Sequence, residues 1–487
     1  MVVGRIISLE NTPNSKEFYF LLKGNIRIGE LVKVKAFEDS YVIGKVVDII
    51  NFNRYFSNAY SLKEIIESGR NLEDIAPIDK WEVNLAKVKV MGLLENDNVK
   101  SFDYSVKAGS IVERVEDEIL KRFLNLDENG LYIGNIKSGQ KIILNLDKLF
   151  RKHCCILAQS GYGKSYTVQV IIEELLSKEK LKIPCLVVFD IHGEYKPFAT
   201  SSEFSLKTKL FEANEIKFST FELTAESIGE LLPEISSTAK KELRRIINNL
   251  KNRKKIFDLN DLINEVDADR RMHENVKSHL VSWLLELESL NIFDKLEYPV
   301  LKDVIKPNNL IVFDLSTTTS LRKKQTVVAK ILRELFKMRI ERKIPPSIIF
   351  LEESHQFAPE QEEKSKAISK PIIETIAREG RKFGLSLVLI SQRPIQLSKT
   401  ALSQCDTKII MHISNPYDID HIGRSAEQLS KEELESLTSL AVGEAFISGE
   451  VIKFPVLIKV REKKIKENIT KDFSELIDEY QEFPKSS

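Results

Sequence analysis

One run of the sequence has the residue types of a site that holds phosphate groups: His153 to Thr167, which reads His-Cys-Cys-Ile-Leu-Ala-Gln-Ser-Gly-Tyr-Gly-Lys-Ser-Tyr-Thr. Its apolar residues 154–157 predict a short strand, and a loop with two glycines then leads into a helix that begins at Lys164. Glycines let such a loop turn its backbone N–H groups toward phosphate oxygens. The lysine can reach the terminal phosphates of a nucleotide, and the hydroxyl of Ser165 can bind Mg²⁺.

The loop departs in one place from the usual G-x-x-x-x-G-K-S/T pattern, because Ala158 replaces the first glycine. A bare Gly-Lys-Ser/Thr triplet occurs by chance in roughly a quarter of chains of this length, so the prediction depends on what the rest of the sequence supplies. The loop residues that we expect at the nucleotide are Ser160, Gly161, Tyr162, Gly163, Lys164, Ser165 and Tyr166.

Two carboxylates, Glu352 and Glu353, directly follow another apolar run, Ser347–Leu351. This is the pattern of a Walker B strand. Glu352 is placed to organise Mg²⁺ through its water shell, and Glu353 is placed to polarise the water that attacks the terminal phosphate. Glu352 stands where an aspartate is more usual. The alternative is that both acids only stabilise the start of a following helix through its dipole.

Further polar residues mark the helix and the strand that come after these acids. The helix ends at Gly384 and carries Arg378 and Arg381, and Gln392 follows the strand Leu385–Ile390. A glutamine at the carboxyl end of a strand can sense the γ-phosphate and orient water. A guanidinium can stabilise the charge of phosphoryl transfer in a neighbouring subunit. For either arginine, the alternative is a favourable cation at a helix C-terminus.

An acidic segment also follows the expected strand Pro184–Phe189, with carboxylates at Asp190 and Glu194. Such carboxylates beside a phosphate loop can position water or Mg²⁺, and we expect Glu194 to lie at the nucleotide. For His192 and Tyr195 we expect local packing.

Strands alternate with helical patterns from Arg151 onward, which predicts an α/β fold with a parallel sheet covered on both faces. The segment Ala225–Phe293 is helical and too long for a single crossover helix, so we expect a helical insertion. The expected strands are Cys154–Leu157, Pro184–Phe189, Asn309–Phe313, Ser347–Leu351, Leu385–Ile390 and Lys408–His412.

The N-terminal part of the chain has a different pattern, in which short alternating runs are separated by turn residues. This pattern predicts a small β-barrel, with a polar or helical insertion near Ser61–Leu72. The expected strands are Val2–Leu9, Glu17–Leu22, Glu30–Ala36, Tyr41–Ile50, Leu85–Leu93 and Ser110–Arg114.

These patterns divide the chain into domains. Two short strands within Leu131–Leu144 lead toward the phosphate loop, and a β-hairpin within 442–460 closes the core. We therefore assign residues 1–115 to the barrel, 116–200 and 300–460 to the nucleotide-binding core, 201–299 to the helical insertion, and 461–487 to a charged, helical C-terminal tail.

The 73 basic and 72 acidic residues leave a net charge of only +1, so any contact with nucleic acid must be local. One basic stretch, with Lys364, Lys366 and Lys370, lies in a loop after the paired acids and suits sequence-independent contacts with DNA phosphates. Another stretch lies in the helical insertion, where a solvated surface is again the alternative: Lys240, Lys241, Arg244, Arg245, Lys251, Arg253, Lys254 and Lys255.

The four cysteines lack the spacing of metal ligands, which favours a role in core packing. The sequence does not start like a secretory leader, and it has no apolar run of the roughly 18 residues that cross a membrane. We therefore expect a soluble, cytoplasmic protein without a membrane partner.

Four motifs together resemble the HerA family of hexameric DNA translocases, which are relatives of FtsK: Asp190-Ile-His-Gly-Glu-Tyr195, Leu351-Glu-Glu-Ser-His355, Arg378-Glu-Gly-Arg-Lys-Phe-Gly384 and Ser391-Gln-Arg-Pro394. The resemblance covers most of the chain, including the barrel, which the family calls the HAS domain. It implies a RecA-like P-loop ATPase that uses ATP and Mg²⁺, forms a hexamer and pumps double-stranded DNA through its centre. It also implies a NurA-type nuclease partner in DNA end resection and repair.

The resemblance also implies roles for single residues. Glu353 is the catalytic acid, Gln392 is the sensor of the γ-phosphate, and Arg381, together with Arg378, is the arginine finger. Lys152 stands where the family often has an arginine near the nucleotide.

Two alternatives stay open. One is a related DNA pump for packaging or conjugation. The other is a nucleotide-gated scaffold that regulates a nuclease partner through the β-barrel, with slow hydrolysis as a timer, and it is motivated by Ala158 and Glu352. Stimulation of ATP hydrolysis by linear duplex DNA separates a motor from a scaffold.

Overall fold

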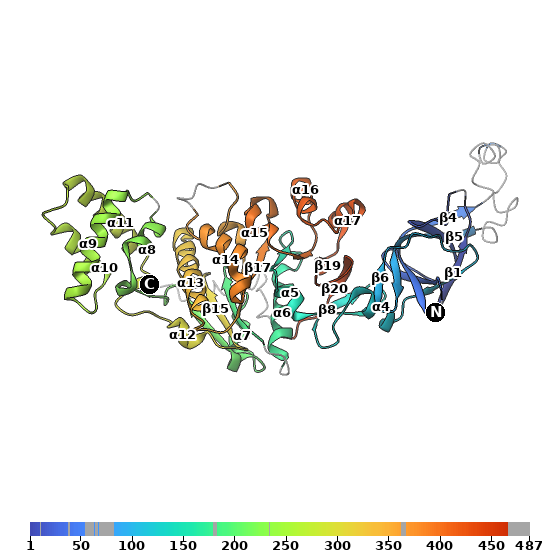
Figure 1. Cartoon of the computed structure of the whole chain (residues 1–487), viewed down its shortest axis with the longest axis horizontal. Coiled ribbons are helices and arrows are strands. Elements are labelled where there is room, and N and C mark those ends of the chain that lie inside the picture. The colour runs from blue at the N-terminus through green and yellow to red at the C-terminus, as the bar shows by residue number, and fades with distance from the viewer. Residues whose placement is uncertain are drawn as a thin grey trace, which may run out of the picture. The chain divides into compact units, whose positions relative to one another are not determined.

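A computed structural model describes residues 1–9, 11–37, 39–53, 63, 67, 82–178, 183–232, 234–361 and 367–465 of the chain. The chain forms two compact units (Figure 1). The first unit comprises Met1–Asn145 and Phe446–Lys459, and the second comprises Leu146–Ala445 and Val460–Ser487. The chain thus returns to the first unit near its end.

The first unit contains a closed antiparallel barrel. Strand β1 pairs with β2 and β7, β7 with β3, β3 with β4, β4 with β5, and β5 again with β2, so the ring has no free edge. Strand β6 pairs outside this ring with β5. The bounds are β1 Val2–Ile7, β2 Glu17–Leu22, β3 Leu31–Lys35, β4 Ser40–Asn53, β5 Glu82–Glu95, β6 Asn98–Lys100 and β7 Ile111–Arg114.

Alternating side chains fill the barrel, as the period of a strand requires. Phe18 and Phe20, two residues apart on β2, are fully buried, and Val32, Val88 and Val112 join them in the core. The predicted small barrel is therefore confirmed. The insertion predicted near Ser61–Leu72 lies almost wholly outside the described residues.

The first unit extends beyond the barrel to Asn145, whereas we predicted that residues 116–145 belong to the core. Helix α4 (Asp117–Leu124) precedes the antiparallel strands β8 (Leu131–Ile136) and β9 (Lys141–Leu144). The ring of Phe123 stacks on Phe454, with centroids 4.8 Å apart. Packing against the returning segment thus holds this region in the first unit.

A parallel sheet forms the centre of the second unit, in the order β12-β15-β11-β16-β17-β10-β18. All of these strands except β12 are buried along their whole length, which explains their continuous apolar sequences. The bounds are β10 Cys154–Leu157, β11 Cys185–Asp190, β12 Thr208–Glu212, β15 Leu310–Asp314, β16 Ser347–Leu351, β17 Leu385–Ser391 and β18 Thr407–Ile410. The predicted parallel α/β fold is confirmed.

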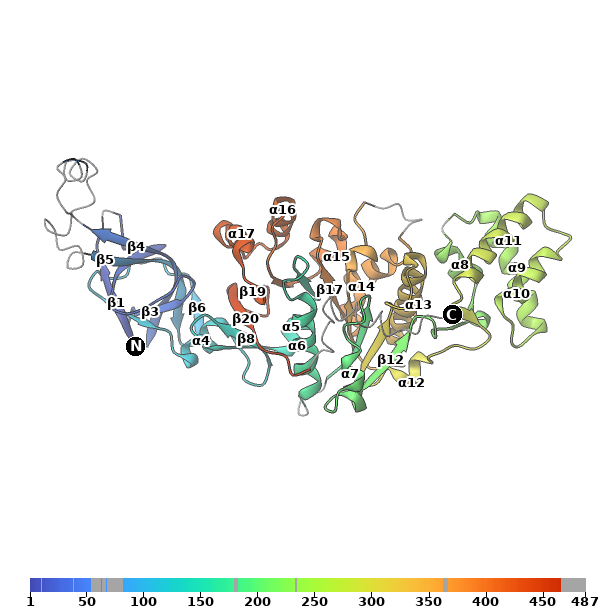
Figure 2. The same ribbon diagram turned by 180° about the vertical axis from the view of Figure 1, so that it is seen from behind.

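Helices connect these strands, and α13 and α14 lie side by side (Figures 1 and 2). Helix α14 ends where Gly384 takes a left-handed backbone conformation, with φ of 73°. The bounds are α5 Leu146–Phe150, α6 Lys164–Ser177, α7 Pro197–Thr200, α12 Leu301–Val304, α13 Leu321–Ile340, α14 Lys370–Phe383, α15 Lys399–Ser403, α16 Pro416–Ser425 and α17 Lys431–Ser436.

The helical insertion is held at its base by a short parallel pair, β13 (Phe218–Ser219) and β14 (Phe293–Asp294). Its helices are α8 Ala225–Leu231, α9 Ser237–Arg253, α10 Leu259–Asp267 and α11 Glu274–Ser289, and they bury one apolar face each. The range 201–299 that we predicted for the insertion is thus too wide, because β12 within it is the edge strand of the sheet.

The end of the described chain differs from the expected helical tail. Strands β19 (Glu444–Ser448) and β20 (Val456–Val460) occupy the predicted hairpin, and residues 461–465 then run on without helical conformation. The rest of the predicted tail, 466–487, lies outside the described residues. No helix in the described ranges is both long and apolar enough to cross a membrane.

Candidate active site

The strand order brings the predicted site residues to one edge of the sheet. Strand β17 lies between β10 and β16, and β11 lies on the other side of β16. Because these strands are parallel, their carboxyl ends share one edge, where ligands of open α/β sheets bind. The phosphate loop, Gln392, the paired acids and Asp190 all follow these strand ends.

The phosphate loop has the backbone that its glycines allow. Gly161 and Gly163 have φ of 84° and 98°, in the left-handed region that favours glycine. Helix α6 begins at Lys164, and no described side chain caps it, so the N–H groups of its first turn are available to an anion. Ala158 is fully buried directly after β10, and its N–H donates to Ser391 O at the end of β17 at 3.2 Å, so this departure from the motif lies at the edge of the sheet.

Lys164 and Glu353 are in direct contact. The lysine Nζ lies 2.8 Å from Glu353 Oε1, and the two side chains are only 10% and 6% exposed. Glu353 has an unusual left-handed backbone for a bulky residue, with φ of 41°, a conformation that costs roughly 1–3 kcal/mol. His355 Nδ1 lies 3.3 Å from the other carboxylate oxygen and 3.1 Å from Ser391 Oγ. Burial lowers the pKa of His355, so this ring favours its neutral form.

Glu352 is buried beside this pair and is 2% exposed. The Tyr195 hydroxyl donates to Glu352 Oε1 at 2.8 Å, while Oε2 has no hydrogen-bond partner among the described residues. Burial, followed by the charges of Asp190 and Glu194, raises the pKa of Glu352 well above its usual range. The fold therefore opposes a negative charge on Glu352 until a cation or a donor approaches Oε2. The contact with Tyr195, which we expected only to pack, was not predicted.

Asp190 shapes the turn that carries Tyr195. Its Oδ1 accepts the backbone N–H groups of His192, Gly193 and Glu194 at 3.1, 2.7 and 3.2 Å, and Oδ2 accepts that of Tyr195 at 2.9 Å. Burial raises the pKa of Asp190 to about 6. The N–H donors lower this pKa and the charge of Asp314 raises it, but burial is the largest cause. Asp190 thus builds the turn, and the side chain of Glu194 is exposed on it.

Comparison with known proteins identifies the family. A family model described as "Helicase HerA, central domain" matches residues 131–335, and one described as "HAS barrel domain" matches residues 4–92. A Methanocaldococcus jannaschii protein named "Probable helicase" is 32% identical, with 91% of this chain and 88% of that protein covered. The chain belongs to the HerA family of helicases. A Pyrococcus furiosus protein named "DNA double-strand break repair helicase HerA" is 28% identical, with 93% and 91% covered.

Solved structures with a similar fold agree with the HerA assignment. VirB4 of Thermoanaerobacter pseudethanolicus has a TM-score of 0.56 at 14% identity, covering 69% of this chain and 97% of that chain. Plasmid coupling protein TrwB, in complex with ADP and Mg²⁺, has a TM-score of 0.52 at 12% identity, covering 73% and 94%. Such identities show the fold alone. They show that this HerA chain has the fold of the P-loop ATPases.

The remaining predicted residues of the HerA site have varied surroundings. Gln392 is half-buried directly after β17. Arg378 and Arg381 are exposed on α14, and their side chains make no hydrogen bond or ion pair within the described residues. Lys152 Nζ lies 4.0 Å from Asp406 Oδ1, an ion pair that ties it to the loop before β18.

Two aromatic residues of the phosphate loop region make contacts with distant parts of the chain, and the sequence did not predict these contacts. The ring of Tyr162 stacks on His412, with centroids 3.8 Å apart and planes 8° apart. The Tyr166 hydroxyl accepts the backbone N–H of Lys463 at 2.8 Å. The sequence signals for these contacts are weak, because His412 and Lys463 belong to no nucleotide motif.

The predicted DNA-contacting lysines are only partly within the described structure. Lys364 and Lys366 lie outside the described residues. Lys370 begins α14 rather than standing in a loop, and its Nζ donates to Glu360 O at 3.1 Å. The direct contact of Lys370 with DNA therefore stays a prediction.

Proposed function

We propose that this HerA-family chain is an ATP-driven motor that translocates along double-stranded DNA as a hexameric ring and works with a NurA-type nuclease. The observation that carries the proposal is the contact of Lys164 with Glu353 at the sheet edge where Gln392 also lies. A phosphate-binding lysine, a catalytic acid and a sensor in one place are what ATP hydrolysis requires.

The buried lysine–glutamate pair links nucleotide binding to catalysis. Lys164 Nζ lies 2.8 Å from Glu353 Oε1, and in this contact Glu353 cannot orient a water molecule freely. The phosphates of ATP compete for the lysine because they carry more negative charge than one carboxylate. Binding of ATP therefore releases Glu353 to polarise the attacking water, and Gln392 orients that water.

The residues present fit Mg²⁺ that arrives with the nucleotide. Ser165 lies in the first turn of α6, and the buried Oε2 of Glu352 has no partner within the described chain. Among the described residues, no three His, Cys, Asp or Glu side chains come together as a metal site. Mg²⁺ characteristically keeps several waters and uses few protein ligands. When bound, it neutralises charge that develops on the phosphates.

Different observations support the ring, the DNA and the nuclease partner. Arg378 and Arg381 are exposed and lack partners in the described part of their own chain, as an arginine finger acting on a neighbouring subunit requires. The Pyrococcus furiosus relative is named a DNA double-strand break repair helicase, which supports DNA as the substrate. The NurA-type partner and the cytoplasmic location depend on the resemblance and the sequence alone.

The proposal is tested by measuring ATP hydrolysis with and without linear duplex DNA. We expect DNA to stimulate the wild-type chain, and we expect both Lys164→Ala and Glu353→Ala to abolish hydrolysis. Glu353→Gln should retain ATP binding, because Lys164 and the loop stay in place. Glu341→Gln is the matched control, since this exposed acid, directly after α13, has Lys343 as its ion-pair partner among the described residues. If hydrolysis occurs without stimulation at any salt concentration, the nucleotide-gated scaffold replaces the motor.

A further inference from the structure

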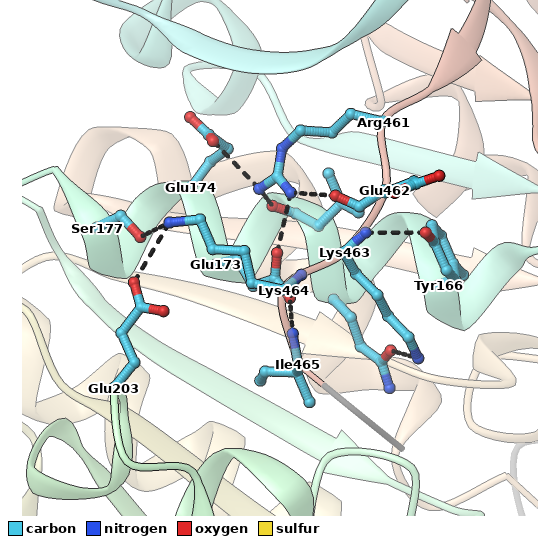
Figure 3. A network of polar contacts seen from close by, with 12 residues as sticks. Tyr166, Glu173, Glu174, Ser177, Glu203, Arg461, Glu462, Lys463, Lys464 and Ile465 are labelled. Carbon is cyan, nitrogen blue, oxygen red and sulfur yellow. Dashed lines mark hydrogen bonds and ion pairs between the residues drawn. The ribbon is translucent and has the colours of Figure 1, made fainter. Parts of the chain in front are cut away.

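The last described residues, Arg461–Ile465, contact the helix that begins at the phosphate loop (Figure 3). We call this segment the C-terminal strap. Its contacts with α6 reach from Tyr166 in the first turn to Ser177 at the end. The strap is far from the loop in sequence, so the fold alone brings them together.

The strap supplies the partners of a buried charge in α6. The side chain of Glu173 is 0% exposed, and a carboxylate so buried requires hydrogen bonds. Its Oε1 accepts the backbone N–H groups of Lys464 and Ile465, both at 2.8 Å, and its Oε2 accepts from Arg461 Nη1 at 3.0 Å. Arg461 also lies 3.1 Å from Glu174, and its own side chain is 8% exposed. Figure 3 shows these residues converging on one side of the helix.

A second set of contacts connects the strap to the first turn of α6. The backbone N–H of Lys463 donates to the Tyr166 hydroxyl, and Lys463 Nζ lies 5.1 Å from the centroid of the same ring. Tyr166 directly follows Ser165, the residue that we propose for Mg²⁺. The strap thus restrains the helix next to the residues that hold phosphate and metal.

Lys463 also begins a series of hydrogen bonds that ends at the paired acids. Its Nζ donates to Gln169 Oε1 at 2.8 Å, and Gln169 Nε2 donates to Glu194 O at 2.8 Å. Gln169 is 1% exposed, so water does not replace these bonds easily. Glu194 lies in the turn built by Asp190, and the next residue, Tyr195, donates its hydroxyl to Glu352. Lys463 is therefore connected to α6 through Tyr166 and Gln169, and through Gln169 to the turn that carries Tyr195, the partner of Glu352.

We propose that the C-terminal strap positions the site for hydrolysis, with Lys463 and Gln169 as positioning residues that hold the 190–195 turn, and hence Glu352, against α6. This inference rests on the proposed function. Neither residue touches the nucleotide in the proposed site, so loss of their contacts should lower turnover more than nucleotide binding.

The test replaces the two side chains singly and together in the full chain. Lys463→Met keeps the length of the side chain but removes its donors, and Gln169→Leu removes the next link. We expect each variant to lower kcat for ATP at least 5-fold, with the Kd for a fluorescent ATP analogue within 2-fold of wild type. Because both changes break the same connection, the double variant should be no slower than the slower single variant.

Lys464→Met is the matched control, because among the described residues its Nζ contacts Ser177 at the end of α6 and Glu203 after α7, both away from the first turn of α6. Its backbone N–H to Glu173 is retained, and we expect wild-type kcat. Unchanged kcat in Lys463→Met and Gln169→Leu, with only a lower melting temperature, would overturn the inference.

Hydrogen exchange separates this inference from the proposed function. In Lys463→Met we expect faster exchange at Thr167 and in residues 192–195, whose N–H groups are hydrogen-bonded, whether or not the wild-type chain hydrolyses ATP. A change confined to the strap itself would contradict the proposal. A wild-type chain that binds ATP without hydrolysing it would instead refute the proposed function, and the exchange measurement would still decide the role of the strap.

Discussion

The charged residues of the nucleotide site and those of the helical insertion lie in the same unit but have opposite surroundings. In the site, Lys164 and Glu353 are almost fully buried with each other, and Glu352 and Asp190 have raised pKa values because burial opposes their charge. In the insertion, charged side chains lie at the surface and pair with one another.

The ion pairs of the insertion use four of the eight cations in the basic stretch that we considered for DNA binding. Arg245 lies 2.8 Å from Glu242 and 2.9 Å from Asp269, and Lys254 lies 2.8 Å from Asp261. The other pairs join Arg244 to Glu226 and Arg253 to Glu265. Hydrogen bonds from these cations lower the pKa values of Glu226, Asp261 and Asp269.

The two regions therefore contain two kinds of charged residue. One kind has its partner within the chain, and the other requires a ligand or a neighbouring subunit as its partner. The four paired cations of the insertion, Arg244, Arg245, Arg253 and Lys254, need nothing more, since each has its acidic partner within the insertion. The site has a carboxylate oxygen without a described partner in Glu352 and exposed arginines without described partners on α14. ATP hydrolysis should therefore respond strongly to changes at the residues of the site that lack a described partner. Changes at the paired residues of the insertion should have little effect.

Among the residues without a described partner, the largest effect is expected for Arg381→Ala. If this arginine completes the site of a neighbouring subunit, its loss should lower kcat by about 10³-fold or more while ATP binding is retained. Hydrolysis by the assembled ring and binding of a fluorescent ATP analogue measure the two quantities. An active Arg381→Ala variant would remove the arginine finger assignment.

Mixed rings supply the control for this prediction. Arg381→Ala subunits keep an intact phosphate loop, and Lys164→Ala subunits keep an intact arginine. Mixing the two inactive variants should restore part of the activity at those interfaces where both intact parts meet. If mixtures stay inactive at every ratio although rings form, Arg381 does not act across an interface.

A smaller effect, on stability, is expected from the raised pKa of Asp190. The folded value of about 6 lies above the unfolded value of about 3.9, so the folded state binds the proton more tightly. Stability linked to this proton is fully present below about pH 4 and declines as pH rises to about 6, by up to about 3 kcal/mol. Asp190→Asn does not titrate and loses the acceptor for the Tyr195 N–H, so it should be less stable than wild type at pH 4.5.

The same variant should approach or pass the stability of wild type by pH 7.5. Thermal unfolding midpoints at both pH values measure this change. Asp314→Asn is the matched control, because Asp314 is the register partner of Asp190 on β15. Burial opposes the charge of Asp314, but the ion pair with Lys196 at 2.7 Å and the hydrogen bonds from Ser316 together outweigh it and lower the pKa of Asp314. The stability from this ion pair is lost only below about pH 4. Loss of the Asp314 charge also removes one cause of the raised pKa of Asp190, so the difference of Asp314→Asn from wild type should change with pH in the same direction but less than that of Asp190→Asn. A constant difference between Asp190→Asn and wild type would contradict the raised pKa of Asp190.

Local patterns predicted the inner strands and the phosphate loop, because a continuous apolar run or a glycine loop carries its own signal. Cys154–Leu157 and Ser347–Leu351 were predicted with their observed bounds, whereas β12 was missed because Thr208–Glu212 is a polar edge strand. Contacts between distant segments were not predictable in this way. Nothing in the sequence around Glu173 indicates that Arg461, 288 positions away, is its partner.

The smallest effect is expected in the insertion, for the double variant Arg244→Ala with Lys254→Ala. Each residue has a surface partner within the insertion, and such pairs contribute about 0–1 kcal/mol to stability. We expect DNA affinity to keep its dependence on salt concentration, measured by fluorescence anisotropy of labelled duplex DNA. If the two cations contacted phosphates instead, the slope of log K against log salt concentration would fall by about 2, because each phosphate contact adds about 0.9. Such a fall would show that the ion pairs of the insertion open when DNA binds. Both regions would then bind a ligand with their charged residues, and they would differ only in which ligand each one binds.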